Sequence, residues 1–261
     1  MRVNTLTNCL SAALISAVAL FQPAFADDGH DGDWEYSASL YLWGAGIEGS
    51  LANGAEVDAS FSDILEQLEF AIMGHFEARQ DKWTVLADAI WMDLAIEDDA
   101  SIPPPAGPGA GASLEADADV EGTIFNLLGG YQLMKQPGSR LDLLFGARYL
   151  DLDLSLEADL TRVGNGQQRS RAADGNQDVV DAVVGLRGTA QFSDNWYYTY
   201  LFDVGTGDSD LTWQALASIG YRYGWGDLAL AYRHLDWEFD SGEPIEDIQF
   251  SGPALQARWN F

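Results

Sequence analysis

The sequence predicts an all-β protein, a transmembrane antiparallel up-and-down β-barrel of about ten strands, and three observations support this fold class. Apolar and polar residues alternate with a period of two over most of the chain, which is the pattern of strands with one apolar face. Short and long connections alternate between these segments, and aromatic residues gather at the ends of the apolar faces. Together these features are typical of a barrel that crosses a bilayer.

Ten alternating segments follow one another along the chain, and each is bounded by turn residues. They cover approximately residues 34–47, 69–80, 82–94, 119–134, 140–156, 178–192, 195–206, 211–223, 227–240 and 247–261. An eight-stranded barrel is the alternative, and it requires that two of these segments form loop hairpins instead of wall strands.

The lengths of the connections predict on which side of the membrane the turns, the loops and the two termini lie. The tight turns are Gln80-Asp81, 135–139, Ser193-Asp194 and 224–226, and the other connections are 48–68, 95–118, 157–177, 207–210 and 241–246. Short turns on one side and longer, acidic loops on the other, with an even strand count, place both termini in the periplasm. Within the first long loop, Phe61, Ile64, Leu65 and Leu68 predict an amphipathic helical turn that packs on the rim.

Residues 1–26 are predicted to be a signal peptide. Arg2 precedes an apolar run from Leu10 to Phe21, and Ala24-Phe25-Ala26 has the small residues of a cleavage site. An acidic linker follows at 27–33, and the barrel is expected over 34–261. Because the one cysteine, Cys9, lies in the signal, disulfides, thiol catalysis and thiolate metal sites are not expected in the exported chain.

The net charge of −28 argues against a nucleic-acid partner, because phosphate contacts need a basic surface. A saline habitat and the solubility of exposed loops both explain the acidity, and attraction of cations is a further explanation.

The apolar faces have the length of a bilayer crossing. The stripes from Trp83 to Trp91 and from Leu141 to Tyr149 each span nine residues, close to the roughly 9–11 that a tilted strand needs. Aromatic residues on these faces are Trp34, Tyr36, Trp83, Trp91, Tyr149, Trp196, Tyr198, Tyr221, Tyr223 and Trp259. Amphipathic rings collect at membrane interfaces, so we expect this face to meet lipid and polar residues to line the interior.

Carboxylates begin where the apolar stripes end. On the same parity as the stripes lie Asp93, Asp151, Asp153, Asp236 and Glu238. At the phosphate layer of lipopolysaccharide, Ca²⁺ or Mg²⁺ would bridge carboxylate and phosphate, whereas a solvated edge needs no ion. These residues are therefore candidates for a metal-binding rim, and no other cofactor is predicted.

The opposite parity carries charges of both signs in near balance. The predicted interior set is Glu35, Glu69, His75, Glu77, Arg79, Asp88, Asp142, Arg148, Asp181, Arg187, Asp203, Arg222, Arg233 and Arg258. Buried charges need partners, and Arg suits such pairs, so these residues predict a salt-bridged filling, with Arg258 reaching Glu35 or Asp142. An ion path lined by the same groups is the alternative.

The sequence resembles the small outer-membrane β-barrels of Gram-negative bacteria, in the style of the OmpA-like and OmpW-like domains. The features that carry the resemblance are the signal, the hairpin series, the aromatic girdles and the closing "ALQARWNF". The resemblance implies recognition by the barrel-assembly machinery through Leu255, Ala257, Trp259 and Phe261. It also implies contact with outer-membrane lipid and lipopolysaccharide, and it brings no activity with it.

No catalytic residue is predicted. Histidines stand only at positions 30, 75 and 234. His234 with Asp236 resembles the Asp–His pair of the protease barrels called omptins, but this pair is expected to face lipid or headgroups. A Gly-x-Ser-x-Gly motif is absent, while a Ser–His site assembled from separate strands stays open.

The predicted function is a monomeric outer-membrane barrel, structural or with a narrow pore, which has a salt-bridged interior and acidic extracellular loops and is not an enzyme. A porin-like, cation-preferring channel for small solutes is the first alternative. An outer-membrane enzyme that acts on lipid or peptide is the second.

Overall fold

The computed structural model describes residues 33–51, 56–59, 68–102, 112–162, 168–240 and 245–261. Trp34–Phe261 form one compact unit. Every regular element among the described residues is a β-strand. The predicted signal peptide and most of the acidic linker lie outside the described residues. Within the described part, no helix has the length and apolarity needed to cross a membrane.

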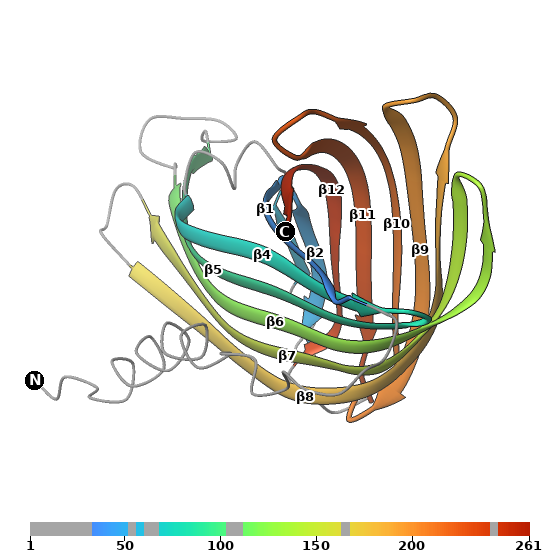
Figure 1. Ribbon diagram of the computed structural model, residues 1–261. Coiled ribbons are helices and arrows are strands. Elements are labelled where there is room, and N and C mark those ends of the chain that lie inside the picture. Colours follow the sequence, from blue (N-terminus) through green and yellow to red (C-terminus); the bar gives the residue numbers. More distant parts are fainter. Residues whose placement is uncertain (1–32, 52–55, 60–67, 103–111, 163–167, 241–244) are drawn as a thin grey trace, which may run out of the picture. The chain divides into compact units, whose positions relative to one another are not determined.

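Ten strands close into an antiparallel barrel (Figure 1), which confirms the predicted fold class and excludes the eight-stranded alternative. Each strand pairs with the next in this series, and β12 pairs with β1. The wall consists of β1 (Glu35–Trp43), β4 (Leu68–Gln80), β5 (Trp83–Ile102), β6 (Ala112–Gln136), β7 (Ser139–Arg162), β8 (Gln168–Gln191), β9 (Trp196–Gly207), β10 (Leu211–Arg222), β11 (Asp227–Glu238) and β12 (Ile245–Asn260).

A short hairpin of β2 (Gly46–Leu51) and β3 (Glu56–Ala59) continues the sheet beside β12. β12 extends further than β1, and an unpaired strand edge would leave its backbone groups without hydrogen-bond partners. β2 pairs with this part of β12 and supplies the partners. The prediction of one strand over 34–47 is therefore wrong, because the chain breaks between β1 and β2 at Gly44. The glycine at position 252 permits the close approach there, since a Cβ on it would collide with the Gly44 carbonyl oxygen.

Two of the predicted long loops are largely strand. The pairing of β5 with β6 runs out to Ile102 and Ala112, and that of β7 with β8 runs to Thr161 and Gln168. Loops at 95–118 and 157–177 are thus corrected to hairpin extensions, whose ladders satisfy the backbone groups. Of the predicted helical turn, Phe61, Ile64 and Leu65 lie outside the described residues, and Leu68 begins β4 instead.

The tight turns all lie at one end of the barrel, which we call the turn end; the opposite end is the loop end. Asp81 in the β4–β5 turn and Gly138 in the β6–β7 turn have φ angles of 53° and 77°. These left-handed conformations suit Gly and Asp in two-residue hairpins.

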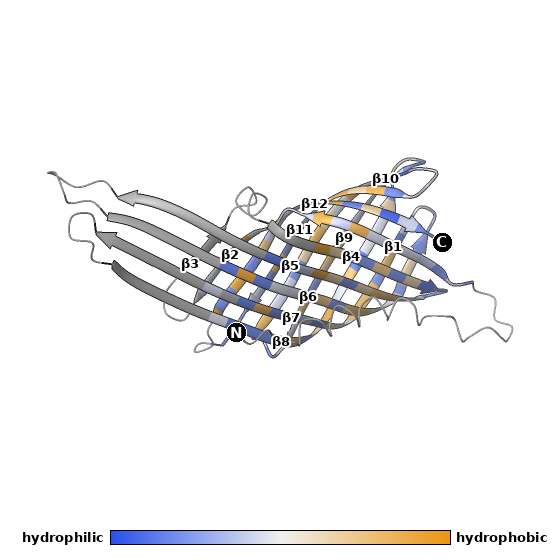
Figure 2. Cartoon of the chain, turned by 90° about the vertical axis from the view of Figure 1, so that its left-hand side faces the viewer, coloured by the Kyte–Doolittle hydropathy of each residue, from blue (hydrophilic) through white to orange (hydrophobic). Residues whose placement is uncertain are grey.

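The outward face of the barrel wall is apolar. Exposed large apolar side chains include Leu40, Leu42, Trp83, Val85, Trp91, Leu127, Phe202, Leu230, Tyr232 and Leu255. Figure 2 shows hydrophobic and hydrophilic residues alternating along the wall strands. Charged residues such as Arg148 and Asp203 are fully buried inside. This is the inverted arrangement of a membrane-spanning barrel.

The polarity of both faces reverses toward the loop end. On β7, Arg148 is buried and Tyr149 faces outward. Two residues further along the strand, Leu150 is buried and Asp151 faces outward. The same switch occurs on β11 between Arg233 and Leu235. The expectation of a polar interior is therefore wrong for this part of the barrel. Beyond the hydrocarbon layer the outer face meets polar surroundings, so apolar residues gain by turning inward, as in a soluble protein.

Candidate functional site

The interior is filled by two charged clusters and two apolar layers, stacked from the turn end to the loop end. The first, which we call the turn-end cluster, consists of Glu77, Arg79, Asp142, Arg140, Arg187 and Arg258. Arg187 Nη1 lies 3.0 Å from Glu77 Oε2, and Arg187 Nη2 lies 3.0 Å from Asp142 Oδ2. Because Arg187 belongs to β8 and Glu77 to β4, this bond crosses the lumen.

The remaining arginines of the turn-end cluster share the same two carboxylates. Arg140 Nε lies 3.0 Å from Asp142 Oδ2, and Arg258 Nη2 lies 3.4 Å from Glu77 Oε2. Arg79 also donates to Glu77. The expected partners of Arg258, Glu35 and Asp142, are thus replaced by Glu77 and Ser37, whose hydroxyl lies 3.0 Å away.

A thin apolar layer follows, formed by buried Leu86, Leu128, Leu144 and Val183 with Leu201 packed against them. It separates the turn-end cluster from the second charged group, so the lumen alternates between polar and apolar cross-sections.

The second charged group, which we call the central cluster, consists of Arg148, Asn126, Asp203, Thr212, Gln214, Arg233, Asp88 and Tyr41. Arg148 forms hydrogen bonds to three of these residues. Its Nε donates to Asn126 Oδ1 at 2.8 Å, Nη1 to Thr212 Oγ1 at 2.9 Å and Nη2 to Asp203 Oδ1 at 2.6 Å. Its guanidinium therefore has a partner in each direction, and its side chain is 0% exposed.

The central cluster continues across the lumen as an unbroken hydrogen-bonded chain. Asp203 Oδ2 accepts from Gln214 Nε2 at 3.1 Å, and Gln214 Oε1 accepts from Arg233 Nε at 2.8 Å. Arg233 Nη2 then donates to Asp88 Oδ1 at 2.9 Å, and the Tyr41 hydroxyl donates to Asp88 Oδ2 at 2.8 Å. The chain connects β7 through β9, β10 and β11 to β5 and β1.

A layer of buried apolar side chains, which we call the plug, lies above the central cluster. It consists of Trp43, Ile47, Ile90, Met92, Val120, Ile124, Leu150, Leu152, Val179, Leu235, Trp237, Phe239, Ile245, Ile248, Phe250 and Ala254. Trp237 and Phe250 are 0% exposed. Arg148 lies 5.8 Å from the Trp237 ring centroid, and Arg233 lies 5.0 Å from that of Trp43. Cation–π contacts of this kind join the two layers.

The other predicted interior residues lie around these clusters. His75 Nδ1 is 4.0 Å from Asp88 Oδ2, and buried Asp181 accepts a hydrogen bond from the Ser209 amide at 3.0 Å. Glu35 and Arg222 are exposed and line the turn end. The side chain of Glu69 lies outside the described residues. Sequence reasoning missed Arg140, Tyr41 and Gln214, although their parity matches that of charged neighbours on the same strands.

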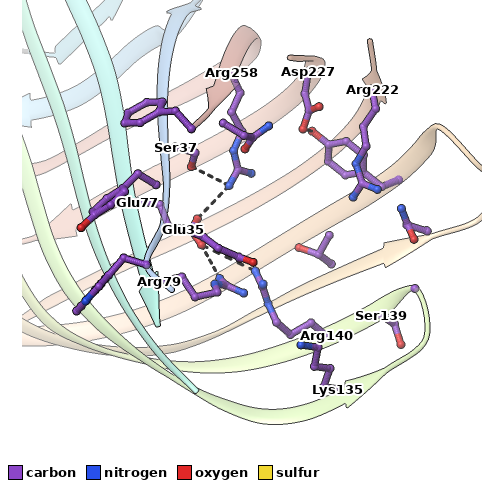
Figure 3. Close-up of a pocket in the computed structure, with 18 of the residues that line it drawn as sticks. Glu35, Ser37, Glu77, Arg79, Lys135, Ser139, Arg140, Arg222, Asp227 and Arg258 are labelled. Atoms are coloured by element: carbon purple, nitrogen blue, oxygen red, sulfur yellow. Dashed lines mark hydrogen bonds and ion pairs between the residues drawn. The ribbon is translucent and has the colours of Figure 1, made fainter. Parts of the chain in front are cut away.

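A cavity of about 760 Å³ lies at the turn end, next to the turn-end cluster. Figure 3 shows Arg140, Arg222 and Arg258 directed into it from different strands. Tyr197 supplies an aromatic ring to its lining.

The rim carboxylates face outward at the loop end, where they lie beside further acids. Asp93 pairs with Glu121 across β5 and β6, and Glu121 pairs with Asp153 across β6 and β7. Asp151 lies opposite Asp178 on β8. Among the residues that the structure describes, no group of three or more His, Cys, Asp or Glu is placed to hold a metal ion.

Burial raises the pKa of the Asp151 carboxyl, and the negative charges of Asp153 and Asp178 raise this pKa further. The folded state then binds this proton more tightly than the unfolded state, so the group lowers stability as pH rises above the ordinary Asp pKa of about 3.9. We expect Asp151→Asn to increase the free energy of unfolding at pH 7 and to have no effect well below pH 4. Urea unfolding at several pH values measures this, with Asp194→Asn in the β8–β9 turn as control. A difference that does not change with pH would contradict it.

His234 and Asp236 lie on the outward face, as the sequence parity indicates. His234 Nε2 is 3.9 Å from Asp236 Oδ2 and has no hydrogen-bond partner among the described residues. The imidazole packs on Trp213, with ring centroids 4.3 Å apart. Ser251 is the neighbour of His234 on β12, and no hydrogen bond joins the two side chains.

The closing residues lie on the outer wall. Leu255, Trp259 and Phe261 are exposed, and Ala257 is half-buried. The Phe261 backbone exchanges hydrogen bonds with that of Tyr36, at 2.9 and 3.1 Å, and the two rings stack 6.2 Å apart.

Comparison with solved structures identifies the fold as that of outer-membrane β-barrels. The crystal structure of the outer membrane protease OmpT from Escherichia coli matches with a TM-score of 0.55 and 14% identity, over 90% of this chain and 99% of that chain. The translocator domain of the autotransporter NalP from Neisseria meningitidis gives a TM-score of 0.40 at 14% identity, over 98% and 96% of the two chains. Ail from Yersinia pestis gives 0.32 at 11%, over 89% and 100%.

No protein-family model matches the sequence, and no curated protein matches it either. The comparisons therefore establish the architecture and leave the activity to be argued from the interior.

Proposed function

We propose that this protein is a monomeric, non-conducting outer-membrane barrel with a structural role and no enzymatic activity. In this proposal the turn end and both termini face the periplasm, and the acidic loop end faces outward. One observation carries the proposal: a hydrogen-bonded chain from Arg148 to Asp88 crosses the lumen beneath a plug of fully buried apolar side chains.

The layered interior opposes ion passage in two ways. Removing one partner from a buried ion pair costs about 3–5 kcal/mol, so an ion that displaces Arg148 or Arg233 must offset that loss. A cation in the plug would meet apolar side chains and the Trp237 N–H, which is a donor and offers it no lone pair, and burying an unpaired charge is more costly still. A barrel of ten strands also leaves little bore once side chains fill it.

Planar-bilayer recording on the refolded mature protein tests the proposal. We expect no stepwise conductance above the bare membrane, because both the central cluster and the plug must open before ions pass. The alternative, a cation-preferring channel, predicts discrete cation-selective steps that change when Arg148 or Asp181 is replaced. An enzyme would release products from lipid or peptide without conducting. Discrete steps from the unmodified protein would overturn the proposal.

The outward carboxylates support a further part of this proposal, that Ca²⁺ or Mg²⁺ bridges the rim to lipopolysaccharide phosphates. Like charges directly opposite each other in a sheet destabilise it, and divalent cations relieve such repulsion through oxygen ligands. We expect divalent cations to raise the unfolding midpoint in lipopolysaccharide-containing membranes. Replacing Asp93, Asp151, Asp153, Asp236 and Glu238 by amides should flatten this dependence. An unchanged dependence would remove the rim from the proposal.

A further inference from the structure

The turn-end cavity carries more cationic than anionic side chains, although the whole chain has a net charge of −28. Its cationic lining residues are Arg79, Lys135, Arg140, Arg222 and Arg258, and its carboxylates are Glu35, Glu77 and Asp227. The side chains of the lining therefore have an excess of two positive charges, five against three.

Ion pairing within the adjoining turn-end cluster is also incomplete. Four guanidinium groups share the carboxylates of Glu77 and Asp142. The Nε atoms of Arg187 and Arg258 are buried and have no hydrogen-bond partner among the described residues. The central cluster has a different balance, because Arg148 and Arg233 there face Asp203 and Asp88, one carboxylate for each guanidinium. A filling that served only to close the barrel would be expected to balance at both levels, since unpaired buried charge is costly.

Arg222 is the cavity's most available guanidinium. It lies over the Tyr197 ring, 5.3 Å from its centroid, and the Gln191 amide faces it as a neutral partner. Within the part of the chain that the structure describes, Arg222 forms no ion pair. Tyr197 is fixed in turn by its hydroxyl, which lies 3.3 Å from Asp227 Oδ2. The guanidinium is therefore oriented without a salt bridge, although Asp227 is the cross-strand neighbour of Arg222.

We infer that the turn-end cavity is a binding site for a phosphate monoester or a phospholipid headgroup of the same chemistry. Guanidinium forks match the oxygens of phosphate, and the excess of two charges matches a phosphate dianion, whose second pKa is about 6. Hydroxyls of Ser37, Ser139 and Thr189 and the Tyr197 ring in the lining provide contacts for the organic part. The volume of about 760 Å³ lies within the range of small-molecule sites.

Calorimetric titration with glycerol 3-phosphate, and with inorganic phosphate, tests this inference on the mature protein in uncharged detergent at low salt. We expect saturable binding of one phosphate group per chain, weakened by added NaCl. Arg222→Gln with Arg258→Gln should weaken binding by at least about tenfold, because hydrogen bonds to charged groups contribute about 1.5–3 kcal/mol each.

Lys82→Gln is the matched control. Lys82 is an exposed cation in the β4–β5 turn, at the same end of the barrel but outside the cavity lining. Its replacement removes one positive charge, as Arg222→Gln alone does, and we expect a loss of about twofold or less, from long-range electrostatics alone. Absence of saturable binding, or an equal loss in Lys82→Gln and the double variant, would overturn the inference.

Two further measurements make the result decisive. The unfolding midpoint of the double variant is compared with that of the unmodified protein. If the midpoint of the double variant is lower, the binding comparison is made with the single variant Arg222→Gln, since this side chain is exposed and makes no ion pair in the described residues. Lipid nanodiscs with and without phosphatidic acid, whose headgroup is a phosphate monoester, then identify the source of the phosphate. Displacement of glycerol 3-phosphate by phosphatidic acid in the unmodified protein indicates a headgroup site, and retained binding indicates a soluble ester.

Discussion

Replacing Arg148 with leucine is expected to lower the free energy of unfolding by about 3–5 kcal/mol, which is the cost of leaving a buried charge without its partner. Arg148 is 0% exposed and Asp203 is 1% exposed, so no water replaces the lost guanidinium. Asp203 would keep only the Gln214 amide as a partner. The hydrogen bonds to Asn126 and Thr212 would be lost as well.

The double variant Arg148→Leu/Asp203→Leu distinguishes this mechanism from a simple loss of packing. Removing both charges leaves no unpaired ion, and replacing buried pairs by apolar groups is often neutral or stabilising. We therefore expect the double variant to be more stable than Arg148→Leu alone. Reversible urea unfolding in detergent micelles, followed by tryptophan fluorescence, measures both.

Arg222→Leu provides the control for this comparison. It makes the same substitution at an exposed arginine that forms no ion pair in the described structure, where we expect a loss of at most about 1 kcal/mol from its cation–π contact with Tyr197. A double variant as unstable as Arg148→Leu, or an equal effect of Arg222→Leu, would show that charge pairing in the lumen does not determine stability.

The parity of the strands allowed much of this site to be predicted. Once the apolar faces were assigned to lipid, Arg148, Asp203 and Arg233 had to point inward, and the structure places them there. The choice of partners was not predictable in the same way. Arg258 bonds to Glu77 rather than to Glu35 or Asp142, because the pairing depends on the curvature and tilt of the barrel, which bring β12 and β4 together through β1.

The apolar plug was missed for a different physical reason. Alternation has the same period on both sides of the hydrocarbon boundary, and only the identity of the inward residues changes. In "RYLDLDL", the shift from inward Arg148 to inward Leu150 and Leu152 is visible, together with the outward shift from Tyr149 to Asp151. Such a reversal is itself a signal, because solvent polarity outside the wall decides which face is apolar. Which plug residues contact one another could be learned only from the structure.

Truncation of Trp237 in the plug is expected to have a similarly large effect on stability. We expect Trp237→Ala to lower the free energy of unfolding by about 3–5 kcal/mol, the range for buried Trp and Phe truncations. Trp237 is 0% exposed, its ring packs edge-on against Phe250 at 6.2 Å, and it covers the Arg148 guanidinium. Its removal thus leaves a cavity directly above a buried charge, which water is expected to enter because a polar partner is present.

Trp225→Ala separates this effect from the general loss of an indole ring. Trp225 is 51% exposed at the turn end and contacts the rings of Tyr223 and Trp259, so its truncation removes two aromatic pairs, each contributing about 0.5–1.5 kcal/mol. Because the central cluster below the plug stays intact, we also expect Trp237→Ala to remain closed in planar bilayers. Stepwise conductance in Trp237→Ala alone would assign the seal to the plug and not to the central cluster.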